Sequence, residues 1–257
     1  MSKFTPGRRS VLIGAAAAAA VVAPAVSASA APPSSAPLAG PWAIELFTSQ
    51  GCSSCPPADT QLGTLRDRPD IVALSFHVDY WDYMGWKDPF ANKAMTYRQR
   101  AYARVLRQRY VYTPEMVVDG VTHEPGVTRA SIDEMLNAAQ HQSTARATPR
   151  LERVMDGPLT ITLAPFKLES ASADIVLAVY DRRHSTPVPR GENTGHTIDN
   201  FNVVRRLETV ARWDGTAAHW TVPPDRFQPN QGIAVLVQHD DYGSMIGCNK
   251  LEPRITG

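Results

Sequence analysis

Two cysteines separated by two residues, Cys52 and Cys55, constrain this chain more than any other feature. An apolar run over residues 42–47 precedes them and is typical of a buried strand, and leucines at helical spacing follow them. Pro56, directly after the second cysteine, is common in the first turn of a helix. The sequence therefore predicts a strand, a Cys-x-x-Cys turn and a helix in immediate succession.

This arrangement is suited to thiol–disulfide exchange. The sulfur of Cys52 would lie near unpaired N–H groups and the positive end of the helix dipole, both of which favour a thiolate. Cys55, one turn further on, would resolve a mixed disulfide and release the substrate. A purely structural disulfide and half of a zinc site are the alternatives, although four-ligand zinc sites usually need a second Cys or His pair at close spacing and none is present. We expect neither a metal nor a cofactor.

Strands and helices alternate in the first half of the chain. Expected after the first helix are a buried strand over 71–76, an aromatic-rich loop over 77–90, a helix over 92–109, two strands over 115–118 and 121–123, and a helix over 129–140. Asp119-Gly120 between the two short strands is a strong hairpin signal. Continuous apolar strands indicate a sheet covered on both faces, so residues 41–142 are expected to form one α/β unit.

The second half shows strand patterns and no convincing helix. The candidate strands cover residues 159–163, 174–180, 203–213, 218–222, 233–238 and 244–251. Residues 143–152 are interpreted as a linker, and residues 153–257 are expected to form an all-β, sandwich-like domain. Residues 182–201 are expected to be a long loop, which in compact domains tends to be functional or mobile.

The first 30 residues have the layout of a signal peptide. Lys3, Arg8 and Arg9 precede an uncharged, alanine-rich apolar run, and Ala28-Ser29-Ala30 offers a cleavage site. The adjacent arginines are similar to a twin-arginine signal. We expect an exported protein, periplasmic or secreted, with residues 31–40 as a disordered tether and no stable membrane span after processing. Removal of residues 1–30 leaves 23 basic and 25 acidic residues, a formal charge of −2, which gives no reason to expect nucleic acid as a partner.

The residues around the cysteines resemble those of a known family. The segment from Glu45 to Asp59 is similar to the opening of the DUF1223 family, which belongs to the thioredoxin-like superfamily, and further matching blocks are residues 75–83, 85–90, 98–100, 112–114, 190–193 and 202–205. The resemblance implies an α/β thioredoxin-like domain, in the order βαβαββα, followed by a β-rich domain. It also suggests that Pro114 follows a cis peptide bond beside the dithiol, with Thr113 offering backbone groups to an extended substrate.

Several further residues are candidates for the site, each with a plainer alternative. Glu45, in an apolar strand, could relay a proton to the resolving thiol, or it could pair with an arginine. His77, Asp79 and Trp81 follow the second strand and could line a substrate groove, since sites gather at the carboxyl ends of strands. A packed aromatic loop is the alternative. The last candidates, Arg190, Glu192 and Asn193, could touch the dithiol if the two halves pack together.

The function expected from these patterns is thiol–disulfide oxidoreduction on an exported protein or a small thiol or disulfide. The alternative is a non-enzymatic secreted binding protein in which the scaffold is stapled by the disulfide. Delivery of a metal by Cys52, Cys55 and His77 is a third possibility, which would require these groups to converge.

Overall fold

The computed structural model describes residues 1–3, 7, 40–143 and 145–253. The expected signal peptide and tether fall almost entirely outside these residues. The fold described below is that of residues 40–143 and 145–253, which belong to one compact unit.

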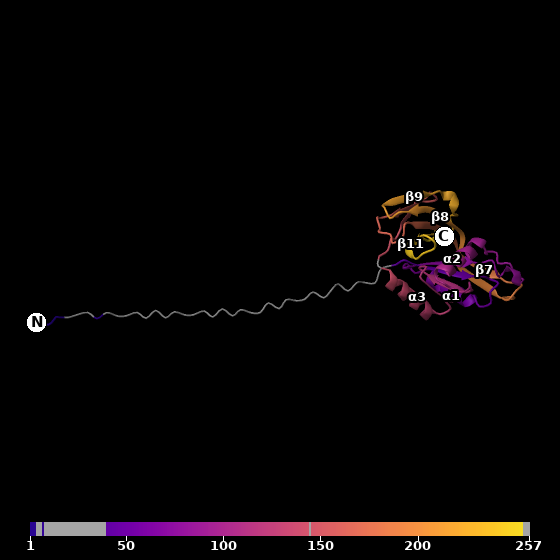
Figure 1. Cartoon of the computed structure of the whole chain (residues 1–257), viewed down its shortest axis with the longest axis horizontal. Helices are drawn as coiled ribbons and strands as arrows, with labels where there is room; N and C mark the ends of the chain where they lie inside the picture. Colours follow the sequence, from indigo (N-terminus) through magenta and orange to yellow (C-terminus); the bar gives the residue numbers. More distant parts are fainter. Residues whose placement is uncertain (4–6, 8–39, 144, 254–257) are drawn as a thin grey trace. The chain divides into compact units, whose positions relative to one another are not determined.

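Three helices and the first four strands occur in the predicted order (Figure 1). The parallel strands β1 and β2 lie side by side, β1 pairs antiparallel with β3, and β3 pairs with β4 across the Asp119-Gly120 turn. The bounds are β1 Trp42–Thr48, α1 Pro56–Leu65, β2 Ile71–His77, α2 Lys93–Val105, β3 Glu115–Val118, β4 Thr122–Glu124 and α3 Arg129–Gln142, with a short 3-10 helix, η1, at Asp82–Met84.

The second half supplies seven strands. Four of them extend the sheet of the first half, and the other three form a separate sheet in the order β5-β6-β9. The bounds are β5 Arg150–Arg153, β6 Leu159–Leu163, β7 Ala173–Pro187, β8 Thr197–Trp213, β9 Ala218–Val222, β10 Gly232–His239 and β11 Met245–Leu251, with a 3-10 helix, η2, at Pro224–Arg226.

The predicted fold class, a thioredoxin-like α/β domain followed by an all-β domain, is wrong. The structure is mostly β, and its main sheet has eight strands in the order β11-β10-β7-β8-β2-β1-β3-β4. The two halves join where β8 runs parallel to β2 with Val203 opposite Ser75, and where the side chain of Asn202 donates to the carbonyl of Ala73 at 2.8 Å. The physical reason is that β2 would otherwise be an open sheet edge with unpaired N–H and C=O groups, which β8 covers.

Apolar residues of β1 point alternately to the two faces of the sheet and pack into a different core cluster on each face. Ile44 and Leu46 pack with buried residues of α1 and α3, whereas Ala43 and Phe47 share a cluster with Met95 of α2. A third cluster lies between β7, β10 and the small sheet. The first two helices and the continuous sheet therefore enclose the strand end at which the cysteines lie.

The expected long loop over 182–201 is mostly strand. β7 continues to Pro187 and β8 begins at Thr197, so that only residues 188–196 remain as a turn at the end of a long antiparallel hairpin. Residues 181–186 are all polar and partly exposed, so this end of β7 shows no alternation of apolar and polar residues that would predict a strand. In the hairpin, Arg183 lies opposite Phe201 and Ser185 opposite Asp199. This hairpin places a turn from the second half beside residues of the first.

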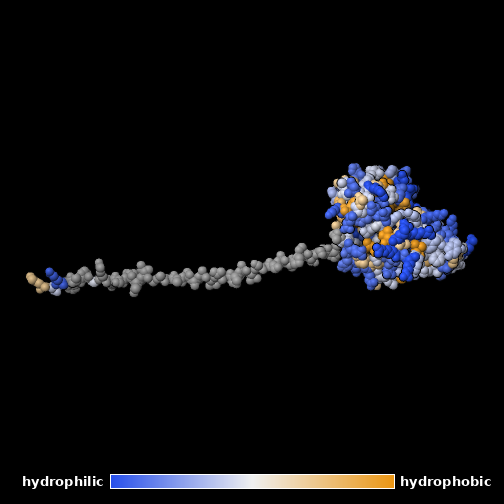
Figure 2. All heavy atoms as spheres, viewed as in Figure 1, coloured by the Kyte–Doolittle hydropathy of each residue, from blue (hydrophilic) through white to orange (hydrophobic). Residues whose placement is uncertain are grey.

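The face of the larger unit in Figure 2 is largely hydrophilic, with hydrophobic side chains visible in smaller areas. Helices long and apolar enough to cross a membrane are not found among the described residues.

Candidate functional site

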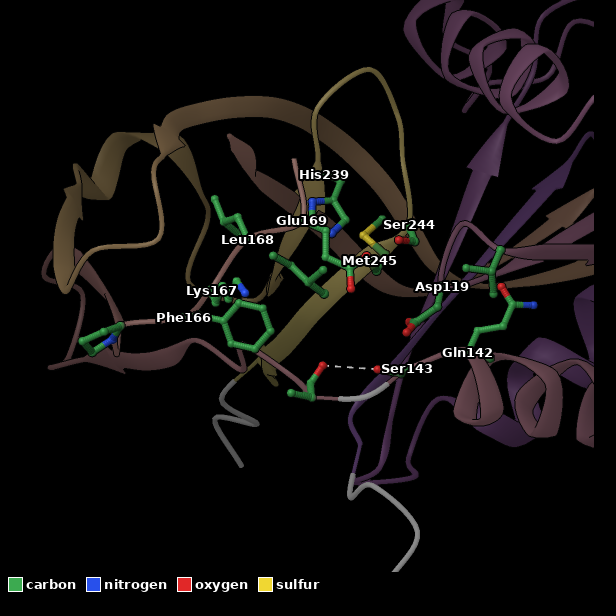
Figure 3. A pocket seen from close by; sticks show the side chains of 15 residues that line it. Asp119, Gln142, Ser143, Phe166, Lys167, Leu168, Glu169, His239, Ser244 and Met245 are labelled. Atoms are coloured by element: carbon green, nitrogen blue, oxygen red, sulfur yellow. Dashed lines mark hydrogen bonds between the residues drawn. The ribbon is translucent and has the colours of Figure 1, made fainter. Parts of the chain in front are cut away.

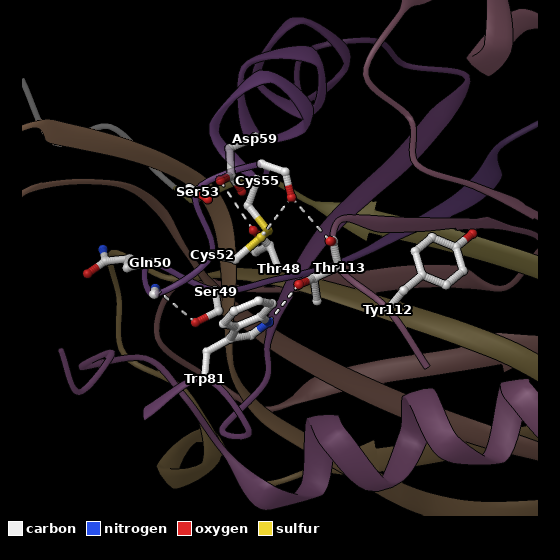
Figure 4. Close-up of a disulfide and its surroundings, with 12 residues drawn as sticks. Thr48, Ser49, Gln50, Cys52, Ser53, Cys55, Asp59, Trp81, Tyr112 and Thr113 are labelled. Atoms are coloured by element: carbon white, nitrogen blue, oxygen red, sulfur yellow. Dashed lines mark hydrogen bonds between the residues drawn. A yellow bond between two sulfur atoms is a disulfide. The ribbon is translucent and has the colours of Figure 1, made fainter. Parts of the chain in front are cut away.

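Cys52 and Cys55 form a disulfide in the turn between β1 and α1 (Figure 4). Their Cα atoms are 5.5 Å apart, and Cys55 is the N-cap residue of the helix. Two main-chain hydrogen bonds hold the turn. The amide of Cys52 donates to the carbonyl of Ser49 at 3.1 Å, and the amide of Cys55 donates to the carbonyl of Cys52 at 3.3 Å. The predicted strand, Cys-x-x-Cys turn and helix are therefore confirmed.

Both cysteines are fully buried, with 0% relative exposure each. The two serines between them are exposed, and the hydroxyl of Ser54 lies 3.4 Å from the sulfur of Cys52. A reagent in solution can thus reach the connecting residues but not the sulfur atoms in this conformation.

The turn over residues 188–196 covers the Cys-x-x-Cys segment. The side-chain amide of Asn193 donates to the carbonyls of Gln50 and Cys52, at 2.9 and 3.0 Å. The carboxylate of Glu192 accepts from the amide and hydroxyl of Ser53, at 3.2 and 2.8 Å. The structure therefore brings two of the three candidates from the second half to the cysteines, while Arg190 is exposed on the same turn.

Gly191 lets this turn pack closely against the aromatic loop. Its φ of +80° lies in the left-handed region, and a Cβ at this position would meet the Cβ of Trp86 at 3.0 Å and the carbonyl of Met84 at 3.3 Å. The indole of Trp86 in turn donates to the side-chain oxygen of Gln50 at 3.1 Å. The turn is thus fitted to a surface formed by the first half of the chain.

The Thr113–Pro114 peptide bond is cis, and Thr113 lies beside the disulfide segment. Its carbonyl accepts from the hydroxyl of Ser54 at 3.4 Å, and its hydroxyl accepts from the indole of Trp81 at 2.7 Å. Trp81 also packs on Gly51, where an added Cβ would lie 3.1 Å from the Cβ of the tryptophan. Thr113 and Trp81 are therefore neighbours of the disulfide, as expected from the sequence.

A cluster of buried polar side chains lies on the inner side of the site. Nδ1 of His77 is 2.7 Å from a carboxylate oxygen of Asp88, and both side chains are fully buried. The same oxygen of Asp88 accepts from the amide of Gln50 at 2.8 Å, which fixes the segment that leads into Cys52. His77 is therefore an internal group rather than part of an open groove.

Asp59 belongs to this cluster. It lies one helical turn after Cys55 in α1, is 3% exposed, and accepts from the hydroxyl of Thr48 at 3.2 Å. Burial raises the pKa of Asp59 to about 7, although the charge on His77 and the hydrogen bond from Thr48 act in the opposite direction. A carboxyl group of this kind can exchange a proton near neutral pH.

Glu45 and Asp79 are placed elsewhere. The carboxylate of Glu45 accepts from Arg98 and from the hydroxyl of Tyr102, the latter at 2.6 Å, which is the arginine-paired alternative. Asp79 accepts from Thr96 of α2 at 2.6 Å and so ties the loop to that helix. The hydrogen bonds of both carboxylates go to residues of α2, away from the cysteines, and so hold elements of the fold together.

Sequence reasoning missed Asp59, Asp88 and Gln50. Asp59 could have been found from its spacing, because residues i and i+4 share a helix face and Cys55 stands four positions before it. The roles of Asp88 and Gln50 depend on contacts across 38 residues and more, for which no local pattern exists.

The third cysteine, Cys248, is buried in β11 and does not join the disulfide. Its thiol donates to the carbonyl of Pro41 at 3.2 Å. Burial raises the pKa of the Cys248 thiol well above its usual range, so this group is a poor nucleophile.

A separate cavity of about 940 Å³ lies between the end of α3 and the connections of the second half (Figure 3). Phe166, Leu168 and Met245 contribute its apolar lining, and Asp119 and His239 are among its polar groups. None of its lining residues takes part in the hydrogen bonds around the disulfide described above. Over the described part of the chain, no group of three or more His, Cys, Asp or Glu residues is arranged to hold a metal ion.

The fold and the site define a mixed α/β protein, rich in β-structure, with a covered Cys-x-x-Cys disulfide at a helix N-terminus. The chain belongs to DUF1223, a family of proteins of unknown function, whose model matches residues 43–238. It is also similar to a protein from Agrobacterium tumefaciens with a known crystal structure, at 31% identity and a TM-score of 0.75; the match covers 86% of this chain and 98% of the other. No curated protein matches the chain.

Proposed function

We propose that this protein is an exported thiol–disulfide oxidoreductase that acts through Cys52 and Cys55. The observation that carries this proposal is the position of the disulfide at the N-terminus of α1, with Cys55 as the N-cap residue. The positive end of the α1 dipole stabilises a thiolate at this position, which makes it a better leaving group in exchange, although Pro56 and Pro57 of the first turn offer no N–H to the sulfur. A disulfide placed only to join two segments would have no need of this environment.

In the oxidising direction, a thiolate of an exported protein or a small thiol attacks the sulfur of Cys52. A bond forms between these two sulfurs, the Cys52–Cys55 bond breaks, and Cys55 leaves as a thiolate. A second thiolate of the client then attacks the client sulfur of the mixed disulfide and releases Cys52. The client loses two electrons and the cysteine pair gains them, and the reverse sequence reduces a client disulfide.

Neither sulfur is exposed, so a client can reach Cys52 only if the turn over residues 188–196, which covers this segment, moves away. The hydrogen bonds from Asn193 and to Glu192 join the cover to the segment that an incoming thiolate must reach. Client binding at the Ser53–Thr113 side would replace contacts of this turn with contacts to the client.

The burial of both sulfurs also favours a second candidate function, that of a secreted binding protein in which the disulfide is purely structural. In that case Cys52 would stay inaccessible and the surrounding aromatic loop would act as a surface. The two functions differ in a measurable property, the reactivity of Cys52.

The test is the redox potential of the pair in the mature protein, read by thiol alkylation across glutathione and dithiothreitol series. A Cys248→Ser background removes the third thiol, and Cys55→Ser in that background is used to trap mixed disulfides. The matched control is Cys52→Ser, in which the resolving thiol is retained and the proposed attacking sulfur is absent.

A potential in the range of catalytic dithiols, roughly −120 to −270 mV, together with trapped partners that depend on Cys52, supports exchange. A redox potential below about −300 mV, with no trapped partner in either variant, supports a purely structural disulfide and overturns the proposal.

A further inference from the structure

Asp59 and the resolving cysteine share one face at the start of α1. The amide of Asp59 donates to the carbonyl of Cys55 at 3.1 Å, which closes the first turn of the helix and directs both side chains to the same side. Figure 4 shows Asp59 next to Cys55, on the side of the disulfide away from Trp81. A carboxyl group therefore lies one helical turn after Cys55, on the side of the helix that carries the sulfur which must gain or lose a proton.

The groups that face Asp59 come from four elements. Thr48 at the end of β1 donates to it, His77 stands at the end of β2, Asp88 is in the following loop, and Asn200 is on β8. Arg205 of β8 acts on His77 in turn. The side chain of Asn200 acts on Asp59 as a hydrogen-bond donor, whereas Nε2 of His77 is buried without a hydrogen-bond partner. A buried ring nitrogen without a partner is uncommon, so the hydrogen-bonding capacity of His77 is not fully used within this cluster.

The pKa values of the ionisable groups in this cluster are shifted in different directions. Burial lowers the pKa of His77, but the interactions with Asp88 and Asp59 raise it by a larger amount. The net shift of this pKa is therefore upward. The pKa of Asp88 is lowered overall, because His77 and the hydrogen bonds to Asp88 outweigh its burial. Both shifts favour the charged forms of His77 and Asp88, beside the carboxyl group of Asp59, whose pKa is raised to about 7.

We propose that Asp59 is the acid–base group for the sulfur of Cys55, and that the His77–Asp88 pair behind it is a positioning pair that keeps its proton exchangeable. This inference rests on the proposed exchange function. When a client thiolate breaks the disulfide, the carboxylic acid of Asp59 gives its proton to the departing Cys55 thiolate. In the reverse step, the Asp59 carboxylate takes the proton of the Cys55 thiol as its sulfur attacks Cys52 and the client thiolate leaves.

Other carboxyl groups are less well placed for this role. Glu45 is held by two hydrogen bonds from Arg98 and one from Tyr102, so its charge is already balanced. Glu192 is exposed and binds Ser53, on the outer side of the segment.

The experiment measures release of a client from the Cys52 mixed disulfide, at pH 5 to 9, in the mature Cys248→Ser protein loaded with a small aromatic thiol. In this protein the release rate should rise with pH through about 7, as the Asp59 carboxylate forms. Asp59→Asn should slow release by roughly 100-fold at pH 8 and remove this rise, because general acid–base catalysis contributes about that much. Asp67→Asn, an exposed carboxylate just beyond the same helix, is the matched control and should leave the profile unchanged.

A second measurement, of the protonation of Asp59, does not depend on thiol–disulfide exchange. Infrared difference spectra of the oxidised protein should show a carboxyl group that titrates near pH 7 and is absent in Asp59→Asn. His77→Gln should move this titration to higher pH, since the positive charge on His77 stabilises the carboxylate.

Release that is equally fast in Asp59→Asn at every pH would overturn the role of Asp59 and leave the exchange function standing. An unchanged titration in His77→Gln would remove the positioning role of the pair. A wild-type chain that accepts no thiol at Cys52 would overturn the exchange function and this inference together, even if the Asp59 titration is observed.

Discussion

The side-chain amide of Asn193 donates to the main-chain carbonyl of Cys52 at 3.0 Å, although the two residues are 141 positions apart. The same amide reaches the carbonyl of Gln50, so one side chain fixes both ends of the segment that enters the disulfide. The turn between β7 and β8 is therefore bound to the segment that contains Cys52, and we expect its contacts to limit access to the sulfur.

Loss of the Asn193 side chain should make the disulfide easier to reduce. Asn193→Ala removes two buried hydrogen bonds, each contributing about 1 kcal/mol, so the covered form loses stability relative to an open form. We expect the rate of reduction by dithiothreitol, followed by alkylation, to rise on the order of tenfold. His196→Ala, on the same turn but exposed, is the control, and equal rates in both variants would show that the cover does not limit access.

Burial of Asp59 should make stability depend on pH. The unfolded chain loses this proton near pH 3.8 and the folded chain near 7, so the folded state binds it more tightly between these values. The free energy of unfolding should therefore fall as pH rises through this window, by at most about 4 kcal/mol from this group.

Urea denaturation of the oxidised protein at pH 4.5, 6 and 8 measures this dependence. The wild type should lose stability between pH 4.5 and pH 8, and Asp59→Asn should lose less, because the variant has no carboxyl group at this position to titrate. A wild-type protein that loses no more stability than the variant would contradict the raised pKa of Asp59.

The pair of Glu45 and Arg98 should matter for stability and not for exchange. Both side chains are buried, so Glu45→Gln leaves a buried guanidinium without its counter-charge, which costs about 3–5 kcal/mol. The double variant Glu45→Gln/Arg98→Met should recover part of this loss in urea denaturation. The pH profile of client release should keep its shape in Glu45→Gln, and a flattened profile would instead make Glu45 the proton relay.

Asn202 should be needed where the two halves of the sheet meet. Its φ of +47° lies in the left-handed region, and its side chain donates to the carbonyl of Ala73 on β2. Asn202→Ala loses the hydrogen bond and strains the backbone, which we expect to cost about 2–4 kcal/mol in thermal or urea unfolding.

Asn202→Gly separates these two effects, because glycine tolerates the backbone conformation and lacks the amide. This variant should be less destabilised than Asn202→Ala. Equal losses would assign the whole effect to the hydrogen bond, and no loss in either would show that β8 is held to β2 by other contacts.

Local elements of the first half were predictable because their signals are short-range. Apolar runs gave β1 and β2, Asp119-Gly120 gave the β3–β4 hairpin, and the proline after Cys55 marked the start of α1. The buried face of α2 depends on long-range contacts, since Tyr97 is 57% exposed while Arg98 is buried against Glu45. An arginine is placed in a core only by a partner that lies far away in the sequence.

The sequence alone was enough to predict the order of strands and helices in the first half and the Cys-x-x-Cys turn at the start of a helix. Only the tertiary structure decided that the sheet is continuous, because the open edge of β2 selects β8 over a distance of about 130 residues. It also decided that Cys52 is covered by Asn193 and that Asp59 meets His77 and Asp88. These contacts depend on burial and on long-range pairing, which no spacing within the chain encodes.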